Sequence, residues 1–261
     1  MLLHALDRGP ENPSGNATPI VFIHGLFGRG RNFGFFQRRL ADTRRTIALD
    51  LRNHGESLHG PMDYSTMAED VYETLNHLGV HSAIIVGHSM GGKTGMMLAL
   101  QHPSMVVRLL VADIAPGEGG FAQGHDLAAR LAALQFPEHL SRVEADTLLA
   151  TVISEPEVRN LMLQNIELGE HPHWQIGISE IAMAMPQIIG WPDIPDGETY
   201  DGPTLFVAGQ RSHYIAPENY PVMKKLFPRY TLKTIEGAGH WVHAEKPNEF
   251  YEILSDFIKE T

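Results

Sequence analysis

Residues 87–92 read Gly-His-Ser-Met-Gly-Gly and place Ser89 in the pattern Gly-x-Ser-x-Gly. A short apolar run at 83–86 precedes the pattern, and helical spacing follows it over 91–101. This order of strand, turn and helix is typical of a nucleophile elbow, a strained turn that exposes a serine hydroxyl. The flanking glycines leave out side chains that would collide with neighbouring backbone. The sequence therefore predicts Ser89 as a nucleophile.

A histidine beyond the last apolar run is the candidate general base. Residues 237–241 read Gly-Ala-Gly-His-Trp, and a glycine-rich loop there can carry His240 over the carboxyl edge of a parallel sheet. Imidazole suits this task because it exchanges protons near neutral pH. His243 is the competitor, but we expect it to begin the next helix and to face away.

The acid that would orient His240 is less obvious, because residues 207–214 contain no carboxylate where one commonly follows the next-to-last strand. Asp113 ends the preceding apolar run, one strand from the nucleophile, and is the predicted acid. Its alternative role is to cap the following turn. Asp201 lies at the wrong end of its strand, and Glu218 lies too far into the following helix.

The loop after the first core strand is the candidate oxyanion loop. Residues 23–28 read Ile-His-Gly-Leu-Phe-Gly. Two backbone N–H groups are predicted to form the oxyanion hole, those of Leu26 and Met90, with Phe27 as the alternative to Leu26. His24 could be read as catalytic, but we expect it to support the loop, because His240 already occupies the better position.

Apolar runs separated by helical patterns indicate how these residues are positioned. Continuous rather than alternating hydrophobicity is typical of strands covered on both faces. Such runs lie at 20–23, 46–49, 83–86, 109–112, 204–207 and 230–235. Helices are predicted over 65–78, with Ser65 as N-cap, over 91–101, and over about 247–259. This alternation predicts an α/β fold with a mostly parallel, doubly wound sheet.

The alternation stops between about residue 116 and residue 202. Leucines at 127, 131 and 134, capping-box patterns at 141–144 and 154–157, and the stretch 179–185 all indicate helices there, and no convincing strand is found. We therefore predict an α/β core of residues 1–115 and 202–261, with a helical cap of residues 116–201 resting on the sheet.

Composition limits the possible partners. The formal charge of −11 disfavours nucleic acid, and no apolar run approaches the roughly 20 residues needed to span a bilayer. The N-terminus becomes polar too soon for a signal peptide, and the absence of cysteine excludes disulfides and thiolate chemistry. We expect a cytoplasmic protein that acts on small molecules; composition leaves the oligomeric state open.

Five stretches together resemble the α/β-hydrolase superfamily and, more narrowly, the small bacterial YbfF-type esterases and their mitochondrial relatives. These stretches are residues 24–28, 50–57, 87–93, 113–116 and 239–241, and the similarity covers most of the chain. The resemblance implies hydrolysis of carboxylic esters or thioesters of short-to-medium acyl chains, without a cofactor. It also fits the absence of an acid from the loop after the next-to-last strand.

Two other functions remain open from the sequence. A carbon–carbon bond hydrolase could use the same three residues, and the lining of the cap pocket would distinguish it. A non-catalytic small-molecule-binding protein could keep the fold, although it would have no need for nucleophile, base and oxyanion loop together.

Other features have plainer interpretations. The arginines at 29, 31, 38, 39, 44 and 45 are expected to form a solvated face, or alternatively a rim that steers anions. Phe33 replaces the third glycine of a dinucleotide fingerprint. His171 and His173 have no further ligands nearby, so no metal is predicted. Met183 and Met185 are expected to fill the core or to line an acyl pocket.

Overall fold

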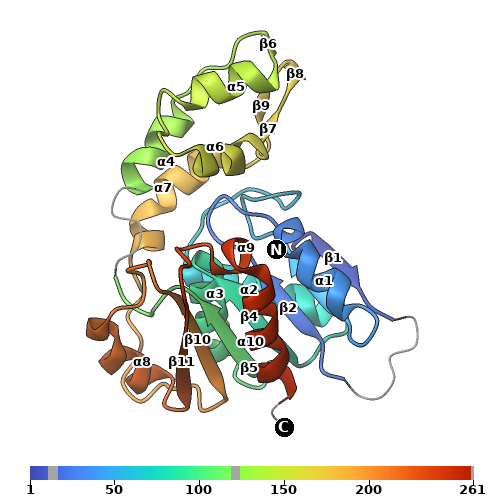
Figure 1. Cartoon of the computed structure of the whole chain (residues 1–261), viewed down its shortest axis with the longest axis vertical. Helices are drawn as coiled ribbons and strands as arrows, with labels where there is room; N and C mark the ends of the chain where they lie inside the picture. Colours follow the sequence, from blue (N-terminus) through green and yellow to red (C-terminus); the bar gives the residue numbers. More distant parts are fainter. Residues whose placement is uncertain (11–16, 119–123, 260–261) are drawn as a thin grey trace.

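The structure, a computed structural model, describes residues 1–10, 17–118 and 124–259, so small parts of both predicted domains lie outside the described residues. A seven-stranded sheet lies at the centre in the order β1-β3-β2-β4-β5-β10-β11 (Figure 1). Only β1 is antiparallel to its neighbour, and the other pairs are parallel, which confirms the predicted mostly parallel sheet. The strands are β1 (Ala5–Arg8), β2 (Ile20–Ile23), β3 (Thr46–Leu49), β4 (Ala83–His88), β5 (Val106–Ala112), β10 (Thr204–Gly209) and β11 (Tyr230–Ile235).

All six apolar runs form strands, and three of these strands extend beyond the predicted runs. β4 continues to His88, β5 begins at Val106, and β10 continues to Gly209. The sequence analysis missed β1, whose four residues are half-buried or exposed. A half-exposed edge strand lacks the continuous apolar run that marks a central one.

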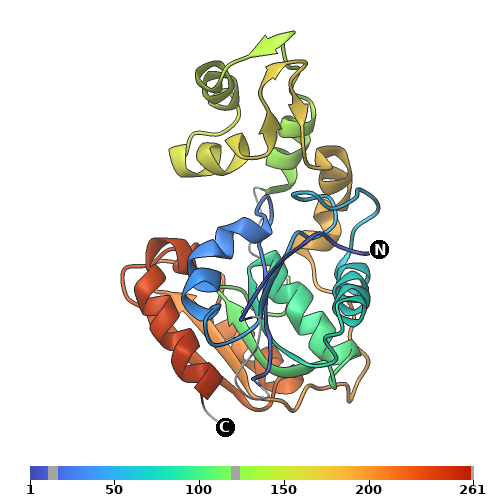
Figure 2. The same ribbon diagram turned by 90° about the vertical axis from the view of Figure 1, so that its right-hand side faces the viewer.

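Helices cover both faces of the sheet (Figures 1 and 2). Helices α1 and α10 pack on one face, and α2, α3 and α8 pack on the other. The helical elements of the core are η1 (Gly30–Phe33), α1 (Gly34–Leu40), α2 (Tyr64–His77), α3 (Met90–Gln101), η2 (Pro217–Asn219), α8 (Tyr220–Leu226), α9 (Val242–Glu245) and α10 (Pro247–Lys259). The predicted N-cap Ser65 is wrong, because the Asp63 side chain accepts the cap hydrogen bond from the Thr66 N–H.

The chain between β5 and β10 forms a separate layer above one end of the sheet (Figures 1 and 2). Its elements are α4 (Gly124–Ala132), β6 (His139–Leu140), α5 (Arg142–Leu149), α6 (Pro156–Leu163), β7 (Ile166–Glu167), β8 (Gly169–Glu170), β9 (His173–Trp174) and α7 (Ile178–Ile189). The expectation of no strand in this region is wrong, because β6 pairs with β8 and β7 with β9. Strands of two residues are too short to produce a periodic pattern.

Of the two capping boxes predicted in the cap, one is confirmed and one is wrong. The capping box at Ser141 is confirmed, since its hydroxyl accepts from the Glu144 N–H while the Glu144 carboxylate accepts from the Ser141 N–H. The box predicted at 154–157 is wrong: Glu155 is the N-cap residue and its side chain makes no capping bond. Proline at the first position, Pro156, presets the backbone there instead.

Buried side chains of the core hold the two segments that connect it to the cap. The Lys93 ammonium donates hydrogen bonds to the carbonyls of Gly117 (2.8 Å), Ile189 (3.3 Å) and Gly190 (2.8 Å). The Tyr64 hydroxyl donates to the Ile188 carbonyl at 2.6 Å. Lys93 thus bonds both the entering and the leaving segment of the cap.

Candidate active site

Ser89 lies in the turn between β4 and α3, with a φ of +53° that non-glycine residues rarely adopt. Packing explains the glycines around it. A Cβ on Gly87 would lie 2.3 Å from the Gly91 carbonyl oxygen, and one on Gly91 would lie 2.3 Å from the Ile23 oxygen. The turn is therefore closed by contacts that only glycine allows, as expected for a nucleophile elbow.

The structure brings Ser89, His240 and Asp113 into one hydrogen-bonded row. His240 Nε2 lies 3.0 Å from Ser89 Oγ, and His240 Nδ1 lies 2.7 Å from Asp113 Oδ2. Ser89 follows β4, Asp113 follows β5, and His240 lies in the loop after β11, so the carboxyl ends of three parallel strands supply them. This arrangement suits proton transfer from the hydroxyl to an imidazole that a carboxylate orients.

The loop after β10, which lacks a carboxylate, holds Asp113 in place. The Gly209 N–H donates to Asp113 Oδ1 at 2.8 Å, and the Ser212 hydroxyl donates to Asp113 Oδ2. Tyr214 stacks on the His240 ring, with centroids 3.9 Å apart. Sequence reasoning missed Ser212 and Tyr214 because it searched this loop only for an acid.

His243, the alternative base, lies close to these three residues but packs against Phe33. Its ring stacks on Phe33 with centroids 5.1 Å apart, and burial lowers its pKa to about 3. His88 packs between the two histidines, and its Nε2 donates to the His240 carbonyl at 2.9 Å. His243 thus packs beneath the His240 loop, whereas His240 alone of the two bonds Ser89.

The predicted oxyanion loop forms a tight turn beside Ser89. The Gly28 N–H donates to the Gly25 carbonyl at 2.9 Å, and a Cβ on Gly25 would lie 3.2 Å from Ser89 Cβ. The Phe27 N–H donates to His54 Nε2 at 3.1 Å, so it is already used. This favours Leu26 over Phe27 as the loop donor, opposite Met90, the first residue of α3.

His24 supports this loop, as predicted. Its Nδ1 donates to the Gly25 carbonyl at 2.7 Å, and its Nε2 accepts from the Leu51 N–H at 3.0 Å. Burial lowers the pKa of His24, which keeps the ring neutral and allows one nitrogen to accept.

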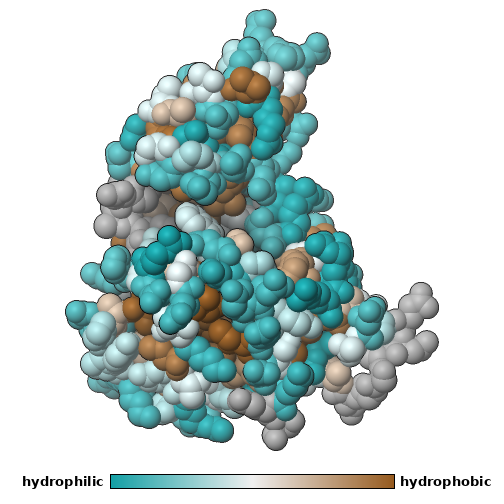
Figure 3. Space-filling view, in the orientation of Figure 1, coloured by the Kyte–Doolittle hydropathy of each residue, from teal (hydrophilic) through white to brown (hydrophobic). Residues whose placement is uncertain are grey.

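A cavity of about 700 Å³ lies above Ser89, between the core and α6 of the cap. Figure 3 shows the recess between the two layers, with apolar surface on the underside of the cap. Cap residues at the cavity include Val158 and Leu161. Neither Met183 nor Met185 is among its described lining residues: the Met183 side chain on α7 is 72% exposed, and Met185 is buried within the hydrophobic packing of the same helix. The alternative acyl-pocket role of these methionines is therefore wrong; the expected core-filling role is confirmed for Met185 and is wrong for Met183.

The charged groups at the cavity are mostly acidic. Glu155, Glu157 and Glu245 line it, together with one guanidinium, that of Arg211, which pairs with Glu245 at 3.0 Å. None of the arginines between residues 29 and 45 is among its described lining residues. Arg29 bonds the cap, and others are spread over the core surface, as in the ion pair of Arg45 with Asp7. The anion-steering alternative is therefore not supported.

No cluster of three metal-ligating side chains occurs within the described ranges 1–10, 17–118 and 124–259. His171 and His173 lie at the far edge of the cap, around β9. Within the same ranges, no helix has the length and apolar content to cross a membrane.

The buried histidines, His24, His54, His88 and His243, should make the fold sensitive to acid, because burial lowers the pKa of each. Burial lowers the pKa of His54 and of His243 from 6.5 to about 3. Below pH 6.5 the unfolded chain therefore binds protons that the folded chain does not bind. The free energy of unfolding should therefore fall as the pH drops from 6.5 towards 3, by about 1.4 kcal/mol per pH unit for each histidine. Replacing His243 with phenylalanine, which can still stack on Phe33, should lower the dependence of the unfolding free energy on pH by about 1.4 kcal/mol per pH unit. Urea unfolding between pH 7 and 4.5 measures it.

The control is His77→Gln at an exposed helical position, which should keep the wild-type slope. Equal slopes for His243→Phe and wild type would contradict the assignment.

Comparison with known proteins gives consistent matches along most of the chain. The model of the alpha/beta hydrolase fold family matches residues 18–247. The mouse sn-1-specific diacylglycerol lipase ABHD11 is 38% identical over 257 residues, covering 94% of this chain and 82% of that protein. Esterase YbfF of Escherichia coli is 32% identical over 246 residues, covering 94% of each chain. Among solved structures, a marine microorganism esterase superposes with a TM-score of 0.91 at 35% identity, covering 98% of this chain and 99% of that one.

Proposed function

Because this chain belongs to the α/β-hydrolase fold family, we propose that it hydrolyses carboxylic esters through an acyl-enzyme formed on Ser89. One observation carries the proposal: His240 lies within hydrogen-bond distance of both the Ser89 hydroxyl and the Asp113 carboxylate. A binding protein would need no such row. The esterase and lipase relatives support the same chemistry.

The reaction follows from these contacts. His240 Nε2 takes the proton of the Ser89 hydroxyl as its oxygen attacks the acyl carbonyl, and Asp113 stabilises the imidazolium. The N–H groups of Leu26 and Met90 hold the oxyanion. The imidazolium then protonates the leaving alcohol, and the acyl-enzyme remains. Water, deprotonated by His240, attacks the acyl carbon, and the acid leaves as Ser89 regains its proton.

The cavity favours small, uncharged esters of short-to-medium acyl chains. Its lining combines apolar side chains of α6 with three carboxylates and only one guanidinium, so an anionic leaving group would be repelled. An uncharged alcohol leaving group is therefore favoured over a strongly anionic thiol carrier.

Hydrolysis of p-nitrophenyl butyrate tests the proposal. The wild-type protein should release nitrophenolate in a burst followed by steady turnover, as an acyl-enzyme does. His240→Ala should lower kcat at least about 10³-fold, because no neighbouring group replaces the base. His243→Ala should lower it less than about tenfold. The reverse order would move the base to His243, and an inactive wild-type protein would remove the ester-hydrolase assignment.

Leu161 should control acyl chain length, because it projects from α6 to the cavity. Leu161→Trp should lower kcat/KM for an octanoate ester at least about tenfold relative to an acetate ester, since one extra or missing methylene in an apolar pocket already costs about 10- to 200-fold. Met183→Trp, on the exposed side of α7, is the matched control and should leave the ratio unchanged. An equal change in both variants would mean that α6 does not contact the acyl chain.

A further inference from the structure

We propose that Asn165, a residue of the cap, is a positioning residue for the oxyanion turn, so that docking of the cap and stabilisation of the oxyanion are coupled. The proposal rests on the proposed ester hydrolysis for its catalytic readout. The contacts that carry it lie on the two sides of a single residue, Phe27.

The turn at 25–28 has a conformation that its own sequence disfavours. The hydrogen bond from the Gly28 N–H to the Gly25 carbonyl closes a β-turn, and Phe27 stands at its third position with a φ of +62°. Glycine usually takes that position in turns of this kind, because a side chain is strained there. A bulky phenylalanine keeps this conformation only where its surroundings hold it.

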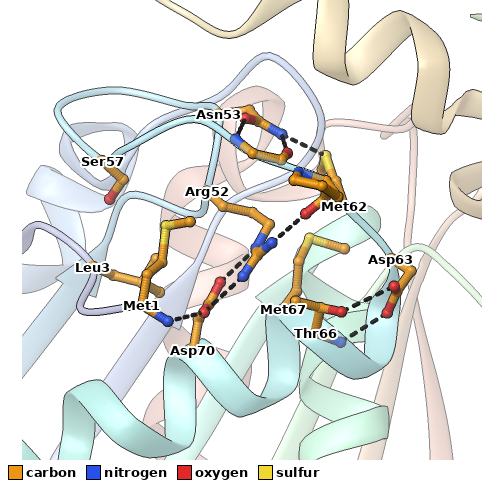
Figure 4. Close-up of polar contacts among 12 residues, drawn as sticks. Met1, Leu3, Arg52, Asn53, Ser57, Met62, Asp63, Thr66, Met67 and Asp70 are labelled. Atoms are coloured by element: carbon orange, nitrogen blue, oxygen red, sulfur yellow. Dashed lines mark hydrogen bonds and ion pairs between the residues drawn. The ribbon is translucent and has the colours of Figure 1, made fainter.

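The core holds the N–H group of Phe27 through His54. His54 Nε2 accepts from the Phe27 N–H at 3.1 Å, and its Nδ1 donates to the Arg52 carbonyl at 2.9 Å. Burial lowers the pKa of His54 to about 3, so the ring is neutral and one nitrogen stays an acceptor. Arg52 is itself fixed, because its guanidinium bonds both oxygens of the buried Asp70 on α2, at 2.6 and 2.8 Å (Figure 4).

The cap holds the carbonyl group of the same residue. Asn165 Nδ2 donates to the Phe27 carbonyl at 2.8 Å, and the Asn165 side chain is fully buried. Asn165 follows α6, the helix that lines the cavity, and its own carbonyl accepts from the Gln175 N–H at 2.8 Å. The strained residue is thus bonded on one side by the core and on the other by the cap.

Leu26, the predicted oxyanion donor, immediately precedes this clamped residue. Without the Asn165 bond, the Phe27 carbonyl would be left buried and unpaired, and the turn could relax towards a negative φ at Phe27. Relaxation rotates the peptide planes of the turn and displaces the Leu26 N–H. Complete loss of one oxyanion donor costs on the order of 10²- to 10³-fold in kcat. A displaced donor should therefore cost less than this.

A second bond between cap and core provides a matched control. The Arg29 guanidinium donates to Gln175 Oε1 at 3.1 Å and to the Gln164 carbonyl at 2.8 Å. Gln175→Leu removes one such bond without touching the turn. Asn165→Leu removes the donor to Phe27 in a side chain of similar size.

With p-nitrophenyl acetate, Asn165→Leu should lower kcat about 10- to 100-fold with KM within about threefold, since this substrate is too short to depend on the cap. The inhibition constant of a trifluoromethyl ketone, which forms an oxyanion on the serine, should rise by the same factor. Gln175→Leu should change neither quantity more than about threefold. Asn165→Ala, which adds no branched side chain at a buried position, repeats the test if the leucine variant does not fold.

Amide hydrogen exchange tests the clamp without any substrate. The Phe27 amide should exchange at least about tenfold faster in the Asn165 variants and at the wild-type rate in Gln175→Leu. If the wild-type protein hydrolyses no ester but the Phe27 amide still exchanges faster in the Asn165 variants, the proposed function is refuted and the role of Asn165 in holding Phe27 stands. Unchanged exchange, or a rise in KM at unchanged kcat, would overturn the positioning role.

Discussion

Replacing Ser89 with alanine should lower kcat for a short-chain activated ester by about 10⁴- to 10⁶-fold and leave the fold intact. The backbone of Ser89 stays bonded in the variant, since its N–H donates to the Ala112 carbonyl and its carbonyl accepts from the Lys93 N–H. Alanine meets the same strain as serine at a φ of +53°. The loss should therefore reflect the missing hydroxyl alone. Steady-state kinetics with p-nitrophenyl butyrate, together with thermal unfolding, measure both parts.

Ser212→Ala is the matched control for this variant. Ser212 donates to the Asp113 carboxylate and belongs to the same site, whereas the hydroxyl that bonds His240 Nε2 is that of Ser89. We expect a loss of less than about tenfold, since one of several bonds to the carboxylate disappears. If Ser89→Ala keeps more than about a tenth of the wild-type rate, Ser89 is not the nucleophile.

Replacing Asp113 with asparagine should lower kcat by up to about 10⁴-fold, also without unfolding the protein. The reason lies in the bonds around the carboxylate. The Gly209 N–H needs an oxygen acceptor, so the amide oxygen of the variant should turn to it and the amide nitrogen should face His240. His240 would then carry its proton on Nε2, where it cannot accept the proton of Ser89.

Glu218→Gln distinguishes this assignment from an acid located after β10. Glu218 lies in η2 and lines a separate, small cavity together with His213 and Tyr214. The variant should turn over at close to the wild-type rate. Near-normal turnover in Asp113→Asn together with collapse in Glu218→Gln would overturn the choice of Asp113.

The local signals in the sequence predicted most of the central sheet and the strand ends at which the candidate site residues lie. Buried parallel strands produce continuous apolar runs, and six of the seven strands were found from those runs. Asp113 follows such a run directly, Ser89 and His240 lie in the loops that follow two others, and parallel strands bring their carboxyl ends to one edge. Their meeting could therefore be predicted without knowing any distance between them.

Other features leave no distinctive local pattern in the sequence. The strand pairs of the cap are two residues long, and β1 is an edge strand, so neither leaves a periodic pattern. The predicted cap at Ser65 failed because Asp63, two residues earlier, competes for the same helix start. Sequence reasoning could not tell which of two suitable side chains bonds the free N–H groups.

The sequence by itself determined which strand ends carry the candidate catalytic side chains, because strand periodicity and loop position are local properties. Only the tertiary structure decided what holds those side chains in place. Ser212 bonds an aspartate 99 residues earlier in the chain, and Asn165 bonds the Phe27 carbonyl across 138 residues. Such bonds depend on how the cap and the loops dock, and docking is set by tertiary packing rather than by residues adjacent in the sequence. The same packing directs α6, and not the methionines of α7, towards the cavity.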